Sequence, residues 1–173
     1  MLRVARGDQA AFRLLAQRYT GRAVRLARRT TGSDADAEEI VQEALLRVWT
    51  NAPRWRPTAA FRTWFYRVVF NLSLNRRRRP PFLGLERAGD PADPAVDPSK
   101  QLERDELDRH VASAIAALPA QQRAAVTLTY AEGLSNAETA AVIGTSVSAV
   151  ETLLVRARRS LRAKLAPMLD DGA

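Results

Sequence analysis

A segment rich in proline and aspartate divides this chain and prevents it from folding around one continuous core. Residues 80–100 contain five prolines, two glycines and three aspartates. A segment of this composition cannot bury enough apolar surface to offset the entropy lost on ordering. On both sides of it, apolar residues recur at helical spacing, and no alternating strand pattern is present. The sequence therefore predicts an all-α protein with two small helical domains, residues 1–79 and 104–173, joined by a flexible linker over 80–103.

Charge is distributed unevenly along the chain. Residues 1–79 hold 17 basic and 6 acidic residues, a net charge of +11, whereas residues 80–110 hold 4 and 8, a net charge of −4. Such asymmetry indicates a polyanionic partner for the first domain. Cysteine is absent and His110 is the single histidine, so thiol or histidine catalysis and a metal site are not expected. We also expect no membrane insertion, because no run of eighteen apolar residues and no signal peptide are visible.

Residues 134–162 have the pattern of a helix-turn-helix. Ser135 and Glu138 have the S-x-x-E spacing of a capping box, and Gly144 permits a positive φ at the corner. In the second helix, apolar residues predict one buried face: Val147, Val150, Leu154, Ala157 and Leu161. The opposite face carries short polar side chains and arginines, which suits a helix in a DNA major groove. The alternative is an ordinary helical hairpin with a solvated basic face.

Aromatic and basic residues alternate over residues 49–79, a stretch that holds all three tryptophans. Aromatic rings stack on unpaired bases while arginines hold the backbone, which is the usual design for single-stranded nucleic acid. Most aromatic residues on helices belong to the core, however, and we expect this of Phe61 and Phe65. Trp55 differs, because it lies between two arginines in a proline-bounded loop where a core role is harder to build.

Four segments occur in a recognisable order: Gly7–Phe12, Asp36–Trp49, Phe61–Leu72 with the arginines behind it, and the helix-turn-helix. Their combination resembles the extracytoplasmic-function class (ECF, group IV) of bacterial RNA polymerase sigma factors. The resemblance covers all of the chain except the linker and the termini. It implies a sigma region 2 helical bundle over 1–79 and a sigma region 4 helix-turn-helix domain over 104–173.

The resemblance implies two contacts with the polymerase core, one at the β′ clamp and one at the β flap. The helix over residues 36–49 would dock on the β′ clamp coiled coil. The matching positions are Glu39, Gln42, Glu43 and Leu46. Without the resemblance, the alternative for these residues is a solvated acidic face.

The resemblance also implies two contacts with promoter DNA. The helix from Phe61 and the loop over residues 51–60 would bind the minus-10 element, melt it and hold a flipped base. The matching positions are Arg54, Trp55, Arg56, Arg62, Trp64, Arg67, Asn71, Arg76 and Arg77. The helix-turn-helix would read the minus-35 element as duplex, through Ser148, Thr152, Val155, Arg156 and Arg159.

Further expectations follow from the same resemblance. The acidic linker would lie in the RNA-exit path of the polymerase, where its charge can mimic nascent RNA. The chain would act in the bacterial cytoplasm, at the nucleoid when it is bound to polymerase, under the control of an anti-sigma factor. No cofactor is implied, because the polymerase performs the catalysis.

The second helix departs from the family pattern at Glu151 and Leu153, where relatives commonly carry basic residues. Two candidate DNA contacts are therefore missing. Glu151 has two interpretations: it can form a capping box with Ser148, or it can accept a hydrogen bond from a cytosine amino group. We favour the capping box.

Two functional alternatives remain beside a sigma factor. A sigma mimic would bind an anti-sigma factor but not DNA; it would be expected to lose its basic surface and to carry a regulatory domain. This chain keeps the arginines at 76–79 and has no room for a receiver domain. The other alternative is an enzyme or RNA-binding protein with a helix-turn-helix appendage. The missing cysteine, the single histidine and the absence of a Walker-type glycine loop argue against an enzyme.

Overall fold

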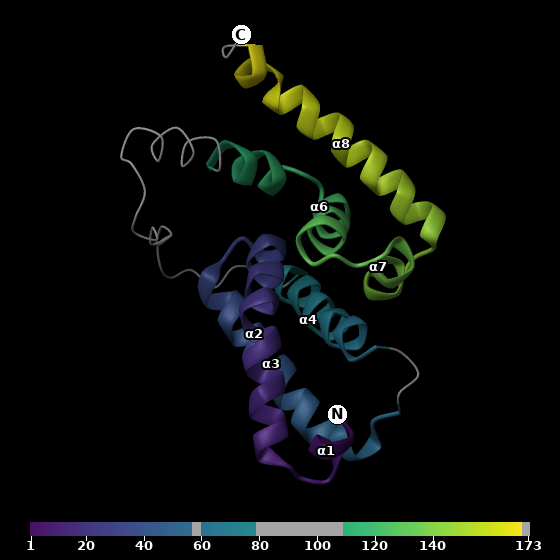
Figure 1. Cartoon of the computed structure of the whole chain (residues 1–173). Helices are drawn as coiled ribbons and strands as arrows, with labels where there is room; N and C mark the ends of the chain where they lie inside the picture. Colours follow the sequence, from purple (N-terminus) through teal and green to yellow (C-terminus); the bar gives the residue numbers. More distant parts are fainter. Residues whose placement is uncertain (57–59, 79–108, 171–173) are drawn as a thin grey trace.

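The computed structural model describes residues 1–56, 60–78 and 109–170, and within these ranges it contains helices and no strands (Figure 1). The prediction of an all-α protein is confirmed. The predicted linker over 80–103 and Arg79 lie outside the described residues. Within the described part, no helix on its own has the length and apolar composition to cross a membrane. One bent pair, Asn136–Ile143 with Val147–Ala166, reaches that length and composition when the two helices are taken together.

The N-terminal half is a bundle of three long helices with a short helix at one end. α2, α3 and α4 pack against one another, and α1 contacts the short 3₁₀ turn η1, which lies within the loop predicted over residues 51–60. The bounds are α1 Leu2–Ala5, α2 Gln9–Thr31, α3 Asp34–Asn51, η1 Ala52–Arg54 and α4 Phe61–Arg78.

The described part of the C-terminal half opens with a helical segment over residues 109–116 and closes with the longest of the described helices. Between them, α6 runs directly into η2, a single π-helical turn, before the chain reverses at Gly133 with φ of 64°. The bounds are α6 Ala120–Val126, η2 Thr127–Ala131, α7 Asn136–Ile143 and α8 Val147–Asp170. Isolated π turns inside helices are frequent at functional sites, and this one faces the N-terminal half.

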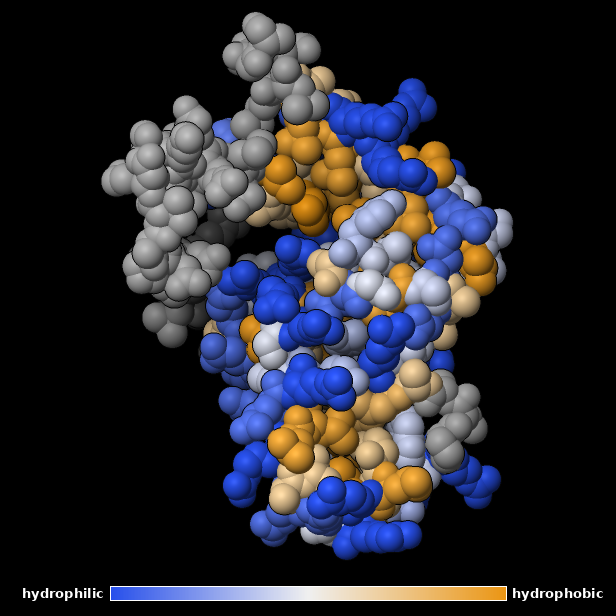
Figure 2. Space-filling model, viewed as in Figure 1, coloured by the Kyte–Doolittle hydropathy of each residue, from blue (hydrophilic) through white to orange (hydrophobic). Residues whose placement is uncertain are grey.

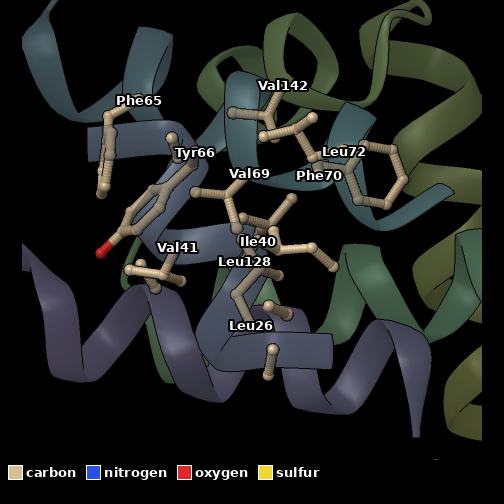
Figure 3. Close-up of a cluster of buried hydrophobic side chains, with 14 of the residues drawn as sticks. Leu26, Ile40, Val41, Phe65, Tyr66, Val69, Phe70, Leu72, Leu128 and Val142 are labelled. Carbon is tan, nitrogen blue, oxygen red and sulfur yellow. The ribbon is translucent and has the colours of Figure 1, made fainter. Parts of the chain in front are cut away.

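One hydrophobic core is shared by the two halves (Figure 3). α2, α3 and α4 contribute most of its buried side chains, among them Leu26, Val41 and Tyr66. Leu128 of η2 and Val142 of α7 complete it from the C-terminal half, and both are fully buried. A second cluster lies within the C-terminal half, between α6, α7 and α8. The two halves are therefore packed against each other by apolar contact in this arrangement, a feature that the sequence pattern left open.

Candidate functional site

Residues 134–162 form the helix-turn-helix that the sequence predicts. The Ser135 hydroxyl accepts a hydrogen bond from the Glu138 N–H at 3.2 Å, and the Glu138 carboxylate accepts one from the Ser135 N–H at 3.0 Å. This reciprocal pair is the predicted capping box. Gly144 ends α7 with φ of 79°, in the left-handed region that glycine adopts without strain. α8 then leaves at 98° to α7, an angle typical of this motif.

The side chains predicted to read the minus-35 (upstream) element share the solvent-exposed face of α8: Ser148, Thr152, Val155, Arg156 and Arg159. Val150, Leu154 and Ala157 are buried on the opposite face, as predicted. The prediction for Val147 is wrong, because this residue is 42% exposed. It is the first residue of α8 and precedes the turns that pack on α6 and α7.

An open apolar groove lies between the N-terminal half of α2 and the C-terminal half of α3. It has a volume of about 690 Å³ and is lined by Gln9, Phe12, Arg13, Ala16, Gln42, Leu45, Leu46 and Trp49. The Phe12 and Trp49 rings meet edge to face with centroids 5.1 Å apart. Leu46 is 60% exposed. The start of α2 and the end of α3 lie at the lower end of the molecule in Figure 1, and Figure 2 shows apolar surface edged by hydrophilic side chains there. Exposed apolar surface with a polar rim is typical of a protein docking site.

The four predicted polymerase contacts divide between this groove and a second, smaller hollow. Gln42 and Leu46 line the groove, whereas Glu39 and Glu43 line a hollow of about 150 Å³ on the side facing α4. Glu39 forms an ion pair with Arg76, which also donates to the Asp36 carboxylate at 2.7 Å. Glu43 forms an ion pair with Arg47. Both glutamates are therefore already paired with arginines of the N-terminal half. The structure places Arg76, a predicted minus-10 contact, against a predicted polymerase contact.

The aromatic cluster around Trp55 gives this residue packing contacts that the sequence pattern did not reveal. Its ring lies edge-on to Trp64 at 5.1 Å and to Phe61 at 6.1 Å between centroids. Phe61 in turn stacks on the buried Phe65 at 5.6 Å. Arg54 and Arg56 beside it are exposed, and residues 57–59 of the same loop lie outside the described residues. The loop therefore presents basic side chains on an aromatic support.

The remaining predicted minus-10 contacts lie along α4. Arg67 and Asn71 are exposed one turn apart, and Arg77 is exposed further along the helix. Arg62 differs from them, because it faces the C-terminal half. Its guanidinium donates to both Glu138 carboxylate oxygens, at 2.7 and 2.8 Å from Nη2 and at 3.1 Å from Nε. One side chain thus belongs to both the predicted promoter surface and the contact between the halves.

A second polar contact joins the halves one turn further along α4. The Tyr66 hydroxyl donates to the Glu132 carboxylate at 2.6 Å, and Glu132 is only 6% exposed. Burial, followed by this hydrogen bond, raises the pKa of the Tyr66 hydroxyl well above its ordinary value. The sequence pattern did not single out Glu132, although it is the only charged residue between positions 124 and 133. Among the described residues, no group of three or more metal-ligating side chains converges.

The Arg62–Glu138 pair has a predicted pH dependence. Hydrogen bonding from Arg62, the largest cause, holds the pKa of the Glu138 carboxyl below its ordinary value. A carboxyl whose folded pKa is lowered stabilises the folded state above its unfolded pKa of about 4.3, and this stabilisation is lost as pH falls through the folded pKa. Glu138→Gln retains a side chain that can complete the capping box but removes the charge.

We therefore expect the unfolding free energies of wild type and Glu138→Gln to differ at pH 7 and to converge at low pH. Denaturant titrations between pH 7 and pH 3 measure this difference. Glu38→Gln, on an exposed glutamate of α3, is the matched control and should show no such convergence. A gap between wild type and Glu138→Gln that stays constant over the whole range would refute the contribution of the pair.

Comparison with known proteins identifies the family of this chain. The sigma-70 region 2 model matches residues 15–80, and the sigma-70 region 4 model matches residues 109–161. The RNA polymerase sigma-H factor of Pseudomonas aeruginosa is 33% identical, over 96% of this chain and 92% of its own length. The chain belongs to the sigma-70 family of RNA polymerase sigma factors. Sigma factors act in transcription initiation and are not enzymes.

This sigma factor is homologous to extracytoplasmic-function members of the family. The ECF RNA polymerase sigma-E factor of Escherichia coli strain K12 is 32% identical, over 96% of this chain and 93% of its own. The structure of CnrH in complex with the cytosolic domain of CnrY matches with a TM-score of 0.68 and 31% identity, covering 99% of this chain and 95% of CnrH. The sigma factor RpoE in complex with the anti-sigma factor NepR from Bartonella quintana matches with a TM-score of 0.72, covering 90% and 97%. At 19% identity, that last match supports the fold alone.

Proposed function

We propose that this sigma factor belongs to the extracytoplasmic-function group IV, binds the RNA polymerase core and directs it to specific promoters. The observation that carries the proposal is the exposed stripe of α8, which follows a capped helix at 98° and combines short polar side chains with arginines. A helix of this kind can enter a major groove and read base edges while arginines bind phosphates. In this proposal α8 reads the minus-35 element.

The N-terminal half would engage the polymerase and the minus-10 element. The groove around Leu46 offers an apolar centre with a polar rim, the composition expected of a specific protein interface, and we assign it to the β′ clamp. The C-terminal half would meet the β flap. The exposed arginines of the loop before α4, with Arg67 and Asn71, would hold the melted minus-10 strand. Captured single-strand contacts would offset the unstacking cost of a few kcal/mol.

Promoter binding by this sigma factor would require the halves to separate. Arg62 is engaged by Glu138, so it is not free for a phosphate or a base while the halves are packed together. We infer that the described arrangement is that of the free factor, with domains over 1–79 and 104–173 that move apart in the bacterial cytoplasm when polymerase binds. The linker over 80–103 would then span the RNA-exit path. Because CnrH was solved in complex with a protein partner, the cytosolic domain of CnrY, we also propose that this chain is controlled by a protein partner, an anti-sigma factor.

Arg156→Ala tests the reading of the upstream element. If Arg156 makes a bidentate base contact, its loss should cost about 1–3 kcal/mol of promoter binding, selectively at one position of the minus-35 element. Polymerase-dependent transcription from a wild-type promoter and from promoters altered at single upstream positions measures this. An equal loss on every upstream sequence would reduce Arg156 to a phosphate contact. A mimic that binds an anti-sigma factor without DNA would give no promoter-dependent transcription with either protein.

A further inference from the structure

The start of α8 leaves the Glu151 carboxylate without the structural role that its spacing suggests. Ser146, not Ser148, caps the helix: the Ser146 hydroxyl accepts a hydrogen bond from the Ala149 N–H at 3.1 Å. Ser148 lies inside α8, and its carbonyl accepts from the Thr152 hydroxyl at 3.0 Å. The capping box predicted between Ser148 and Glu151 is therefore wrong. The residue three positions after the actual cap is an alanine, so no carboxylate takes part in this helix start.

The helix also provides no basic partner for Glu151. The positions three and four residues away on either side carry uncharged side chains: Val147, Ser148, Leu154 and Val155. Within the described part of the chain, no side chain forms an ion pair with this carboxylate. Glu151 is exposed. A solvated, unpaired carboxylate does not destabilise the free protein. Its position on α8, however, means that it affects DNA binding.

Glu151 stands in the middle of the stripe that the proposed function places in the major groove. It follows Ser148 by three residues and precedes Val155 by four, so the three side chains share one side of the helix with Thr152. A carboxylate at this place is repelled by phosphates. It gains a favourable contact only where a base edge offers a hydrogen-bond donor.

The major groove offers a carboxylate two donors, the N4 amino group of cytosine and the N6 amino group of adenine. The adenine amino group is flanked by acceptors on both sides, N7 of its own ring and O4 of the paired thymine. The cytosine amino group has an acceptor on one side only, O6 of the paired guanine. Repulsion between the carboxylate and these neighbouring acceptors therefore disfavours adenine. A glutamate at this position accepts its hydrogen bond from cytosine.

We propose that Glu151 is a specificity-determining residue of α8 that accepts a hydrogen bond from the exocyclic amino group of one cytosine in the upstream promoter element. This inference rests on the proposed function. The carboxylate also weakens binding to every sequence that lacks cytosine there, because it then remains unpaired beside the DNA. The site thus excludes wrong promoters as well as selecting the right one.

The test is a selection with the full-length chain and purified polymerase core on promoters randomised over the upstream element. Wild type should prefer cytosine at one position by about fivefold or more, the discrimination expected of a base contact worth about 1 kcal/mol. Glu151→Ala should lose that preference and leave the other positions unchanged. Glu151→Gln should change it to adenine, because a glutamine amide binds N6 and N7 together. Glu38→Gln, on an exposed glutamate outside the proposed contacts, is the matched control.

The outcomes separate this inference from the proposed function. If wild type selects an upstream sequence and both Glu151 variants select the same sequence, Glu151 does not read a base and the inference is overturned. If the variants lose preference equally at every upstream position, Glu151 acts on the helix as a whole, which also overturns it. If wild type selects no upstream sequence in the presence of polymerase, the proposed function itself fails, and the inference fails with it.

Discussion

Leu46→Asp is expected to lower the affinity of this sigma factor for the polymerase core by about 2 kcal/mol, roughly thirtyfold in Kd. Leu46 is 60% exposed and lines the groove between α2 and α3. In the free protein an aspartate at this position stays in water, so the fold should be unaffected. In the complex the same carboxylate would be transferred from water into an apolar contact without a partner, which is strongly unfavourable.

Leu14→Asp provides the matched control, because Leu14 is 64% exposed on α2 and does not line the groove. Fluorescence anisotropy of labelled protein titrated with core polymerase gives both affinities. We expect a loss of affinity for Leu46→Asp alone. Unchanged affinity in both variants would move the polymerase contact away from this groove, and equal losses in both would show that general surface polarity, not the groove, governs binding.

Leu128→Ala is expected to destabilise both halves of the molecule, by about 2–5 kcal/mol in total. Leu128 is fully buried in the core shared by the two halves, where it lies among side chains of α2, α3 and α4 (Figure 3). Removing it leaves a cavity between the halves. The N-terminal helices should therefore exchange their amide hydrogens faster in the variant, although the substitution lies in η2.

Leu154→Ala is the matched control for this effect. Leu154 is 4% exposed and belongs to the second cluster, which lies within the C-terminal half. The same substitution there should accelerate exchange in α6, α7 and α8 and leave α2, α3 and α4 protected. If hydrogen exchange in the N-terminal helices is equally unaffected by both variants, the halves do not support each other in solution.

Local features of this fold could be predicted from the sequence because their causes lie within a few residues. The capping box of α7 and the glycine corner before α8 follow from one serine, one glutamate and one glycine at fixed spacing. The capping box predicted between Ser148 and Glu151 was wrong, because two serines have suitable positions. Ser146 and Ser148 lie two residues apart, and spacing alone cannot decide which of them begins the helix; the structure shows that Ser146 does.

Contacts between the halves could not be predicted in this way. Arg62 and Glu138 are 76 residues apart in sequence, and each already had a complete local interpretation, one as a promoter contact and the other as half of a cap. Trp55 is similar, because its neighbours Phe61 and Trp64 lie beyond a proline-bounded loop. Periodicity identifies which face of a helix is apolar. It does not identify the helix that covers that face, or the charged groups that meet at its edge.

The most direct measurement of the central claim is transcription in vitro with purified polymerase core, this sigma factor and a library of candidate promoters. We expect transcripts that depend on the added chain and come from promoters that share both a minus-35 and a minus-10 sequence. Binding to the core without such transcripts would contradict promoter recognition and favour a mimic. Absence of binding to the core would contradict the account as a whole.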